Sequence, residues 1–158
     1  MDGDSAGVTM RNSIVPWLNV RKSAQAVEFY KAAFGAVEVY RIEDPDGNVV
    51  ARLSVEGAEF WVGDESPEHS NFSPESLGGS TVRIIFTVAD PDAMFERALK
   101  AGAIQVWAVT EEHGWRVGRV ADPFGHQWEI GRPVQAIENT PGGRGASGIS
   151  GSSGLGMA

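Results

Sequence analysis

A histidine and a glutamate stand three residues apart in the stretch RVADPFGHQWEI, residues 119–130, directly after an Asp-Pro-x-Gly turn. Imidazole and carboxylate groups bind divalent metal ions and transfer protons, so this spacing raises the question of a metal site or an acid–base site. Alternation along the following strand puts His126 on the same face as Trp128 and Ile130, and Glu129 on the opposite face. We therefore predict a structural, hydrogen-bonded role for His126 and a functional role for Glu129.

The strand that carries Glu129 is the last of eight that hydrophobic alternation predicts, and helical spacing predicts two helices besides. Ser23 and Asp90 are the expected N-caps of these helices. The strands are expected at residues 13–20, 36–42, 48–55, 58–63, 81–88, 104–110, 115–121 and 126–131, and the helices at 23–34 and 90–101. The order of one strand, one helix and three strands occurs twice, with matching spacings between the glycines that end helices and turns.

This repeat predicts an α+β fold of two tandem βαβββ modules, residues 13–63 and 81–132, which must share one core because each half is small. The polar, turn-rich residues 64–80 are expected to link the modules. Residues 1–12 and the Gly/Ser-rich residues 133–158 lack an apolar period and are expected to be disordered.

Composition excludes several classes of function. The 158 residues include 13 Lys and Arg against 21 Asp and Glu, a net charge of −8, which disfavours nucleic acid and anionic membrane surfaces as partners. The absence of Cys removes thiolate catalysis, disulfides and Cys-type zinc sites. Because no apolar run is long enough to span a bilayer and no targeting segment is recognisable, we expect a cytoplasmic protein.

Strand parity predicts two different faces for each sheet. One face should lie under the helices and carry Ile14, Pro16, Leu18, Val20, Val82, Ile84, Phe86 and Val88. The opposite face mixes large aromatic side chains with polar ones, a combination typical of a sheltered ligand cavity, although an ordinary interface is the alternative. The predicted ligand-binding residues on it are Trp17, Asn19, Trp61, Arg83, Thr87, Gln127 and Glu129.

Two tandem βαβββ units that contain AVEFYKAAFGA (26–36) and DPFGHQWEI (122–130) resemble the vicinal oxygen chelate superfamily. This superfamily includes glyoxalase I, bleomycin resistance proteins and extradiol dioxygenases. The segment GWRVGRVADPFGHQWEIG (114–131) looks like its PhnB-related, glyoxalase-like branch. The resemblance implies curled sheets that form clefts, usually within a homodimer.

In the metal-dependent members of this superfamily, the first and last strands of the modules supply the metal ligands. The matching positions here are Val15, Trp61, Arg83 and Glu129, and only Glu129 has a side chain that binds a divalent ion. The permanent charge of Arg83 would also repel a cation. We therefore predict neither metal nor other cofactor. Arg83 should pair with Glu129, either as an ion pair in place of the metal or as an anchor for a substrate carboxylate or carbonyl.

The resemblance and these residues together favour a metal-independent binding protein. It would be a homodimer whose cleft holds a planar or amphipathic small molecule by Trp stacking, as drug-sequestering antibiotic resistance proteins do. The alternative is a glyoxalase-like lyase or isomerase, or a dioxygenase, with Glu129 as a divalent-metal ligand or as a general base. A role limited to association with another protein chain is a third reading. The sequence thus leaves open whether the protein is an enzyme.

Overall fold

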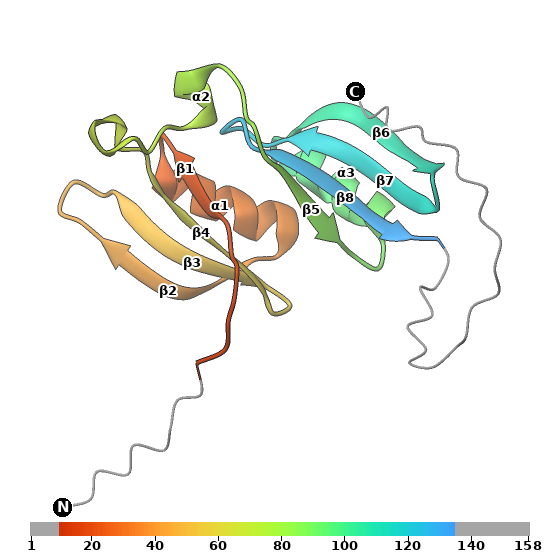
Figure 1. Ribbon diagram of the computed structural model, residues 1–158, viewed down its shortest axis with the longest axis horizontal. Helices are drawn as coiled ribbons and strands as arrows, with labels where there is room; N and C mark the ends of the chain where they lie inside the picture. The colour runs from red at the N-terminus through yellow and green to blue at the C-terminus, as the bar shows by residue number, and fades with distance from the viewer. Residues whose placement is uncertain (1–9, 135–158) are drawn as a thin grey trace, which may run out of the picture.

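The computed structural model describes residues 10–134 and shows two four-stranded sheets side by side (Figure 1). The α+β fold of two βαβββ modules is confirmed. The elements are β1 (Trp17–Val20), α1 (Ser23–Phe34), β2 (Val37–Glu43), β3 (Val49–Val55), β4 (Ala58–Asp64), η1 (Pro67–His69), α2 (Pro74–Leu77), β5 (Arg83–Thr87), α3 (Pro91–Ala101), β6 (Ile104–Glu112), β7 (Trp115–Ala121) and β8 (Gln127–Pro133). Most of the two ends predicted to be disordered, residues 1–12 and 133–158, lies outside the described residues.

The two sheets have the same topology. Their strand orders are β1-β4-β3-β2 and β5-β8-β7-β6, with the first and last strands of each module parallel and the other neighbours antiparallel. In the first sheet Trp17 lies opposite Trp61, and in the second Ile85 lies opposite Glu129. The register therefore makes Trp61 the structural counterpart of Glu129.

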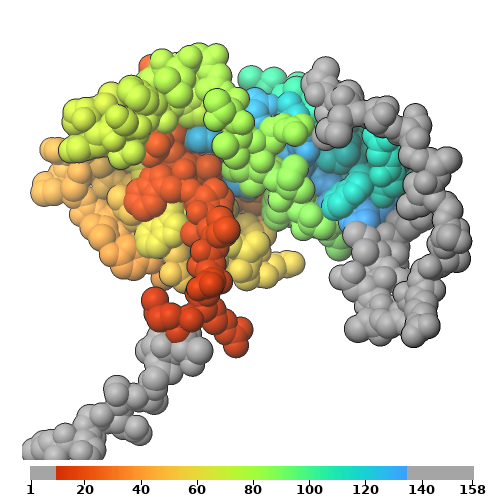
Figure 2. Space-filling view, viewed as in Figure 1, coloured from red at the N-terminus to blue at the C-terminus, as the bar shows by residue number. Residues whose placement is uncertain are grey.

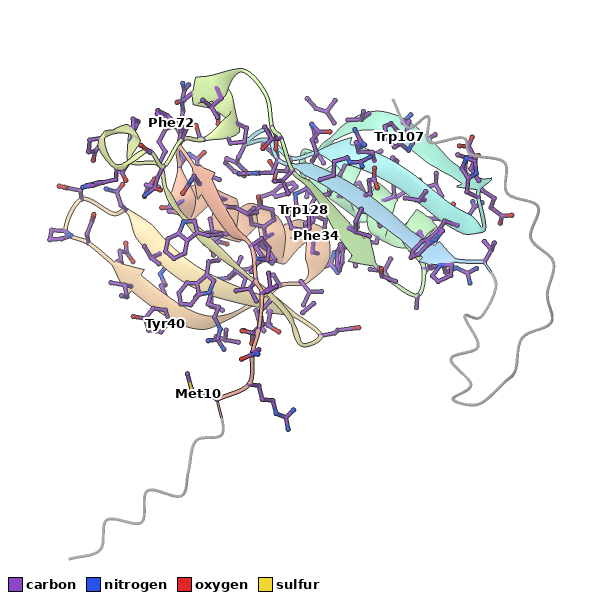
Figure 3. All side chains as sticks on the ribbon, viewed as in Figure 1. Met10, Phe34, Tyr40, Phe72, Trp107 and Trp128 are labelled. Carbon is purple, nitrogen blue, oxygen red and sulfur yellow. The ribbon has the colours of Figure 1, made fainter. Side chains whose placement is uncertain are left out.

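Both long helices cover the same side of the two sheets and pack against each other (Figure 1). One core joins the modules, because Phe34 at the end of α1 lies 4.7 Å from Trp128 of β8 and 5.1 Å from Phe86 of β5, measured between ring centroids. Phe34 and Trp128 meet where the two halves adjoin (Figure 3). The buried apolar side chains of residues 10–134 form one cluster that includes residues of both modules.

The buried carboxylate of Asp122 ties the modules together at the turn between β7 and β8. It accepts hydrogen bonds from the Tyr30 hydroxyl on α1, from Trp128 Nε1 at 2.9 Å, and from the backbone N–H groups of Phe124 and His126 at 2.9 and 3.0 Å. Gly125 completes the turn with a φ of +91°, and a Cβ there would lie only 2.7 Å from Pro74. A single carboxylate thus fixes one helix, one turn and one strand.

Several local predictions are wrong. Ile14 and Val82 are strongly exposed instead of covered by the helices, because β1 begins only at Trp17 and β5 only at Arg83. Ser23 is the first helical residue and not the N-cap, since its hydroxyl donates to Asp64 Oδ2 at 2.6 Å and accepts from Val49 N at 2.8 Å.

Other helix-end predictions are confirmed. Asp90 caps α3 by accepting from Ala93 N at 3.1 Å, and Gly35 ends α1 in the left-handed conformation. No helix among residues 10–134 is long and apolar enough to cross a membrane.

We expect Asp122→Ala to lower the free energy of unfolding by about 3 kcal/mol or more, because it leaves several buried donors without an acceptor. Asp44→Ala is the matched control, since Asp44 opens a similar Asp-Pro-x-Gly turn and accepts from the N–H groups of Asp46 and Asn48, but in an exposed position. Urea unfolding measures both variants. Equal losses in the two would contradict the anchoring role of Asp122.

The pH dependence of stability tests the same Asp122 cluster. Burial, and after it the nearby Asp122 carboxylate, raises the pKa of Tyr30 well above its ordinary value. Below a pH of about 10 the tyrosine is neutral in both the folded and the unfolded chain. Above it the unfolded chain loses the proton first, so stability falls as pH rises. Urea midpoints at pH 8 and pH 11 should therefore differ more for the wild type than for Tyr30→Phe. An equal difference would overturn this assignment.

Candidate ligand-binding site

The surface of the two sheets that faces away from α1 and α3, called the open face below, carries the predicted site residues. Trp17 is 50% exposed and Ile85 58% exposed on this face. The space-filling view from this side shows the segment leading into β1, in red, at the front of the molecule between the sheets (Figure 2). Because both helices lie on the other side of the sheets, a ligand cavity on the open face would need a cover other than α1 and α3.

Glu129 and two arginines form a hydrogen-bonded cluster on the open face of the second sheet. Glu129 Oε1 accepts from Arg83 Nη1 at 3.2 Å and from Arg119 Nη2 at 2.7 Å. The Glu129 side chain is only 11% exposed, whereas the Arg83 side chain is 42% exposed. The predicted pairing of Arg83 with Glu129 is therefore present, with a second guanidinium added.

Arg119 was absent from the predicted set of site residues. It lies on β7 directly opposite Glu129, and its guanidinium carbon is 3.9 Å from the centre of the Trp107 ring on β6. The signal that could have found it is the tight turn at residues 122–125, since a short turn fixes which residues of β7 and β8 face each other. Trp107 and Glu129 together hold the Arg119 side chain in place.

The first sheet has a related but aromatic arrangement. Trp17 stacks on Trp61 with ring centroids 5.5 Å apart and planes 10° apart, and Tyr40 meets Trp61 edge-on at 5.6 Å. Gly63 makes the stack possible, because a Cβ there would lie 2.9 Å from the Trp17 ring. Arg52, the counterpart of Arg119, donates to Glu59 at 3.2 Å. Tyr40 and Trp107 lie far apart, one on each sheet (Figure 3).

The remaining predicted ligand-binding residues are Asn19, Gln127 and Thr87. The carbonyl oxygen of Asn19 lies 2.9 Å from Nε2 of His126, which gives His126 the predicted hydrogen-bonded structural role. Gln127 lies across from Arg83, and Thr87 is exposed on β5. Within residues 10–134, no hydrogen bond, ion pair or ring contact joins the Trp17–Trp61 pair to the Arg83–Glu129 pair. The open face therefore holds two separate groups.

A small apolar cavity of about 170 Å³ lies where the two modules adjoin. Its walls include the core aromatic rings of Phe34, Phe60, Phe86 and Trp128 together with aliphatic side chains, and Glu59 and Ile85 of the open face also line it. An apolar cavity of about 150 Å³ holds one benzene ring, so a cavity of this volume has room for a single ring.

Comparison with known proteins identifies the fold. Residues 17–131 match the Glyoxalase-like domain family. The chain belongs to this family. Within the vicinal oxygen chelate superfamily that the sequence resembles, it shares its fold with proteins of different roles.

Relatives of this glyoxalase-like protein come from bacteria and plants. An uncharacterized protein of Mycobacterium tuberculosis is 41% identical over 140 residues, which cover 85% of this chain and 82% of the relative. The X-ray structure of an Arabidopsis thaliana gene product, At5g48480, is 33% identical, covers 77% of this chain and 98% of that one, and has a TM-score of 0.61. The fosfomycin resistance protein FosX from Listeria monocytogenes also has a TM-score of 0.61, covering 82% and 98%, but at 15% identity it shows the fold alone.

The metal ion of metal-dependent relatives does not fit this glyoxalase-like protein. Val15 and Trp61 have no suitable donor atoms, and Glu129 Oε1 is already shared by two guanidinium groups. A dication bound by that carboxylate would lie close to two fixed positive charges. Among residues 10–134 there is also no group of three or more His, Asp or Glu side chains that could hold an ion.

We expect no stoichiometric ion to remain on the purified protein after incubation with Ni, Zn, Mn or Fe(II) and removal of the excess. The reason is the repulsion from Arg83 and Arg119 at the only superfamily ligand position that keeps a carboxylate. Elemental analysis is the measurement. About one ion per chain in the wild type, absent from Glu129→Gln, would refute the assignment and support metal-dependent chemistry.

Proposed function

We propose that this glyoxalase-like protein is a metal-independent small-molecule binding protein whose open face holds a planar or amphipathic ligand. The observation that supports it best is the Arg83–Glu129–Arg119 cluster at the superfamily's metal-ligand positions, on the same face as a stacked, partly exposed tryptophan pair in the other sheet. Exposed aromatic surface of this kind marks a site of interaction, because removing apolar surface from water lowers the free energy.

The ligand's apolar part is assigned to the first sheet. Trp17, Trp61 and Tyr40 offer flat ring faces and edges on three of the four strands, β1, β4 and β2, and Arg52 on the intervening β3 lies 5.8 Å from the Trp61 ring centre. A planar molecule gains both buried area and ring stacking on such a surface. Stacking tolerates many ring systems, so this part of the site supplies affinity more than selectivity.

A second copy of the chain is the partner we assign to the open face. The face exposes apolar side chains on both sheets, including Tyr40, Ile42 and Ile85, and the two long helices lie on the other side. A homodimer would enclose the ligand in a cleft between sheets of two protomers, and enclosure is what small-molecule affinity needs. Neither nucleic acid nor a membrane surface fits an acidic chain of net charge −8.

The finer proposal is sequestration of a drug-like molecule by a member of the PhnB-related branch, within a cytoplasmic compartment. FosX shows that an antibiotic resistance protein can have this fold. At 15% identity the likeness concerns the fold alone, and it guides only which compounds to screen first, namely antibiotics.

Catalysis by Glu129 is the competing function. Its support is that Oε2 of Glu129 accepts no hydrogen bond from the described residues, which leaves one carboxylate oxygen for a substrate proton. A glyoxalase-like lyase or isomerase of this kind would lose turnover in Glu129→Gln. Unchanged turnover in that variant would exclude Glu129 as the general base.

We expect a panel of planar aromatic antibiotics to include members that quench tryptophan fluorescence on titration. Trp61→Ala should then weaken binding, measured by equilibrium dialysis, by at least about tenfold, because it removes the centre of the aromatic surface. Phe72→Ala is the control, since Phe72 is also exposed but lies in the linker. A complete lack of binding across the panel, or equal binding by Trp61→Ala and wild type, would contradict the proposed function.

A further inference from the structure

We propose that the ligand of the open face carries one planar negative group, of the carboxylate class, and that Arg83 receives it. This inference rests on the proposed function and specifies the chemistry of its ligand. It follows from the charge balance of the second sheet, from the unused donors of Arg83, and from the difference between the two sheets.

The charge balance of the cluster is positive. Two guanidinium groups, Arg83 and Arg119, share one carboxylate, Glu129, so one positive charge is left over. The whole chain has a net charge of −8, which makes this surplus the reverse of the protein's general charge. Because Glu129 is buried and Arg83 is partly exposed, the uncompensated charge is presented to solvent by Arg83.

Some N–H donors of Arg83 make no hydrogen bond to residues 10–134, whereas the Arg119 side chain is mostly buried. Only Nη1 of Arg83 makes a hydrogen bond with a partner among residues 10–134. The Nε and Nη2 donors form a planar edge that matches two carboxylate oxygens. The Arg119 side chain is only 14% exposed and is held between Glu129 and Trp107, so it orients Glu129 and through it Arg83.

The first sheet shows that the surplus charge is specific to the second. At the equivalent positions, Arg52 is balanced by Glu59, and the place of Glu129 is taken by Trp61. One sheet therefore offers neutral stacking and the other offers an anion receptor. A ligand with an aromatic ring and one carboxylate complements both, while a cationic analogue would meet Arg83 unfavourably.

Three naphthalene derivatives of nearly equal size test this: 2-naphthoate, 2-naphthamide and 2-naphthylmethylammonium. In equilibrium dialysis at low salt we expect 2-naphthoate to bind at least about tenfold more tightly than the amide, and the cation to bind most weakly. Rising NaCl should weaken the binding of the anion and leave that of the amide nearly unchanged.

Arg83→Gln should reduce the affinity for 2-naphthoate to about that for 2-naphthamide. Arg83→Lys should retain part of the preference, because the charge remains but the planar pair of donors is lost. Lys100→Gln is the charge-matched control on α3, away from the open face, and should bind all three compounds as the wild type does.

The possible results separate this inference from the proposed function. Equal affinity for anion and amide, with both lost in Trp61→Ala, would overturn the anion receptor and leave the binding function in place. If Arg83→Gln weakened the binding of 2-naphthoate and 2-naphthamide equally, the anion receptor would be overturned as well. Arg83 would then maintain the structure of the open face and not select the ligand by its charge. No binding of any of the three would count against both.

Discussion

The carboxylate of Asp122 is the interaction on which the rest of the structure depends. It is 3% exposed and takes donors from α1, from its own turn and from the indole of β8. A buried carboxylate is costly unless hydrogen bonds surround it, and once they do it fixes all its partners at once. Since Tyr30 belongs to the first module and Trp128 to the second, this group also determines how the modules meet.

The position of the candidate site follows from this anchor. Asp122 sets the turn, the turn sets the register of β7 with β8, and that register places Arg119 opposite Glu129. Trp128, the residue before Glu129, is held by Asp122 on the core side, so Glu129 must point to the open face. The contact between His126 and the carbonyl of Asn19 adds a second link between β8 and β1. The functional carboxylate is therefore positioned by packing on the opposite side of its own strand.

Much of this arrangement could be predicted from the sequence, because a period of two residues decides which face a side chain takes. The eight strands, the repeat and the pairing of Arg83 with Glu129 all follow from that period. Strand ends could not be predicted in the same way, since Ile14 is as apolar as a core residue but lies before Trp17, where β1 begins, and is exposed. The pairing of Arg119 with Glu129 and the Asp122 anchor were not predicted, because both depend on pairings between segments that alternation within one strand does not reveal.

The duplication of the module explains why one chain can offer two kinds of surface. Equivalent backbone positions carry Trp61 in one sheet and Glu129 in the other, and Tyr40 in one where Trp107 stands in the other. The scaffold holds both sets by the same hydrogen-bond ladder, so a change of side chain on the open face has little effect on the packing beneath it. In the first sheet Arg52 needs Glu59 because Trp61 has no charge to offer, whereas in the second Glu129 serves two arginines and Gln127 stands where Glu59 does. The exchange of an acid for an amide at that position, together with Arg83 where the first sheet has Val15, leaves the second sheet with its positive charge and makes the two halves of the open face chemically complementary.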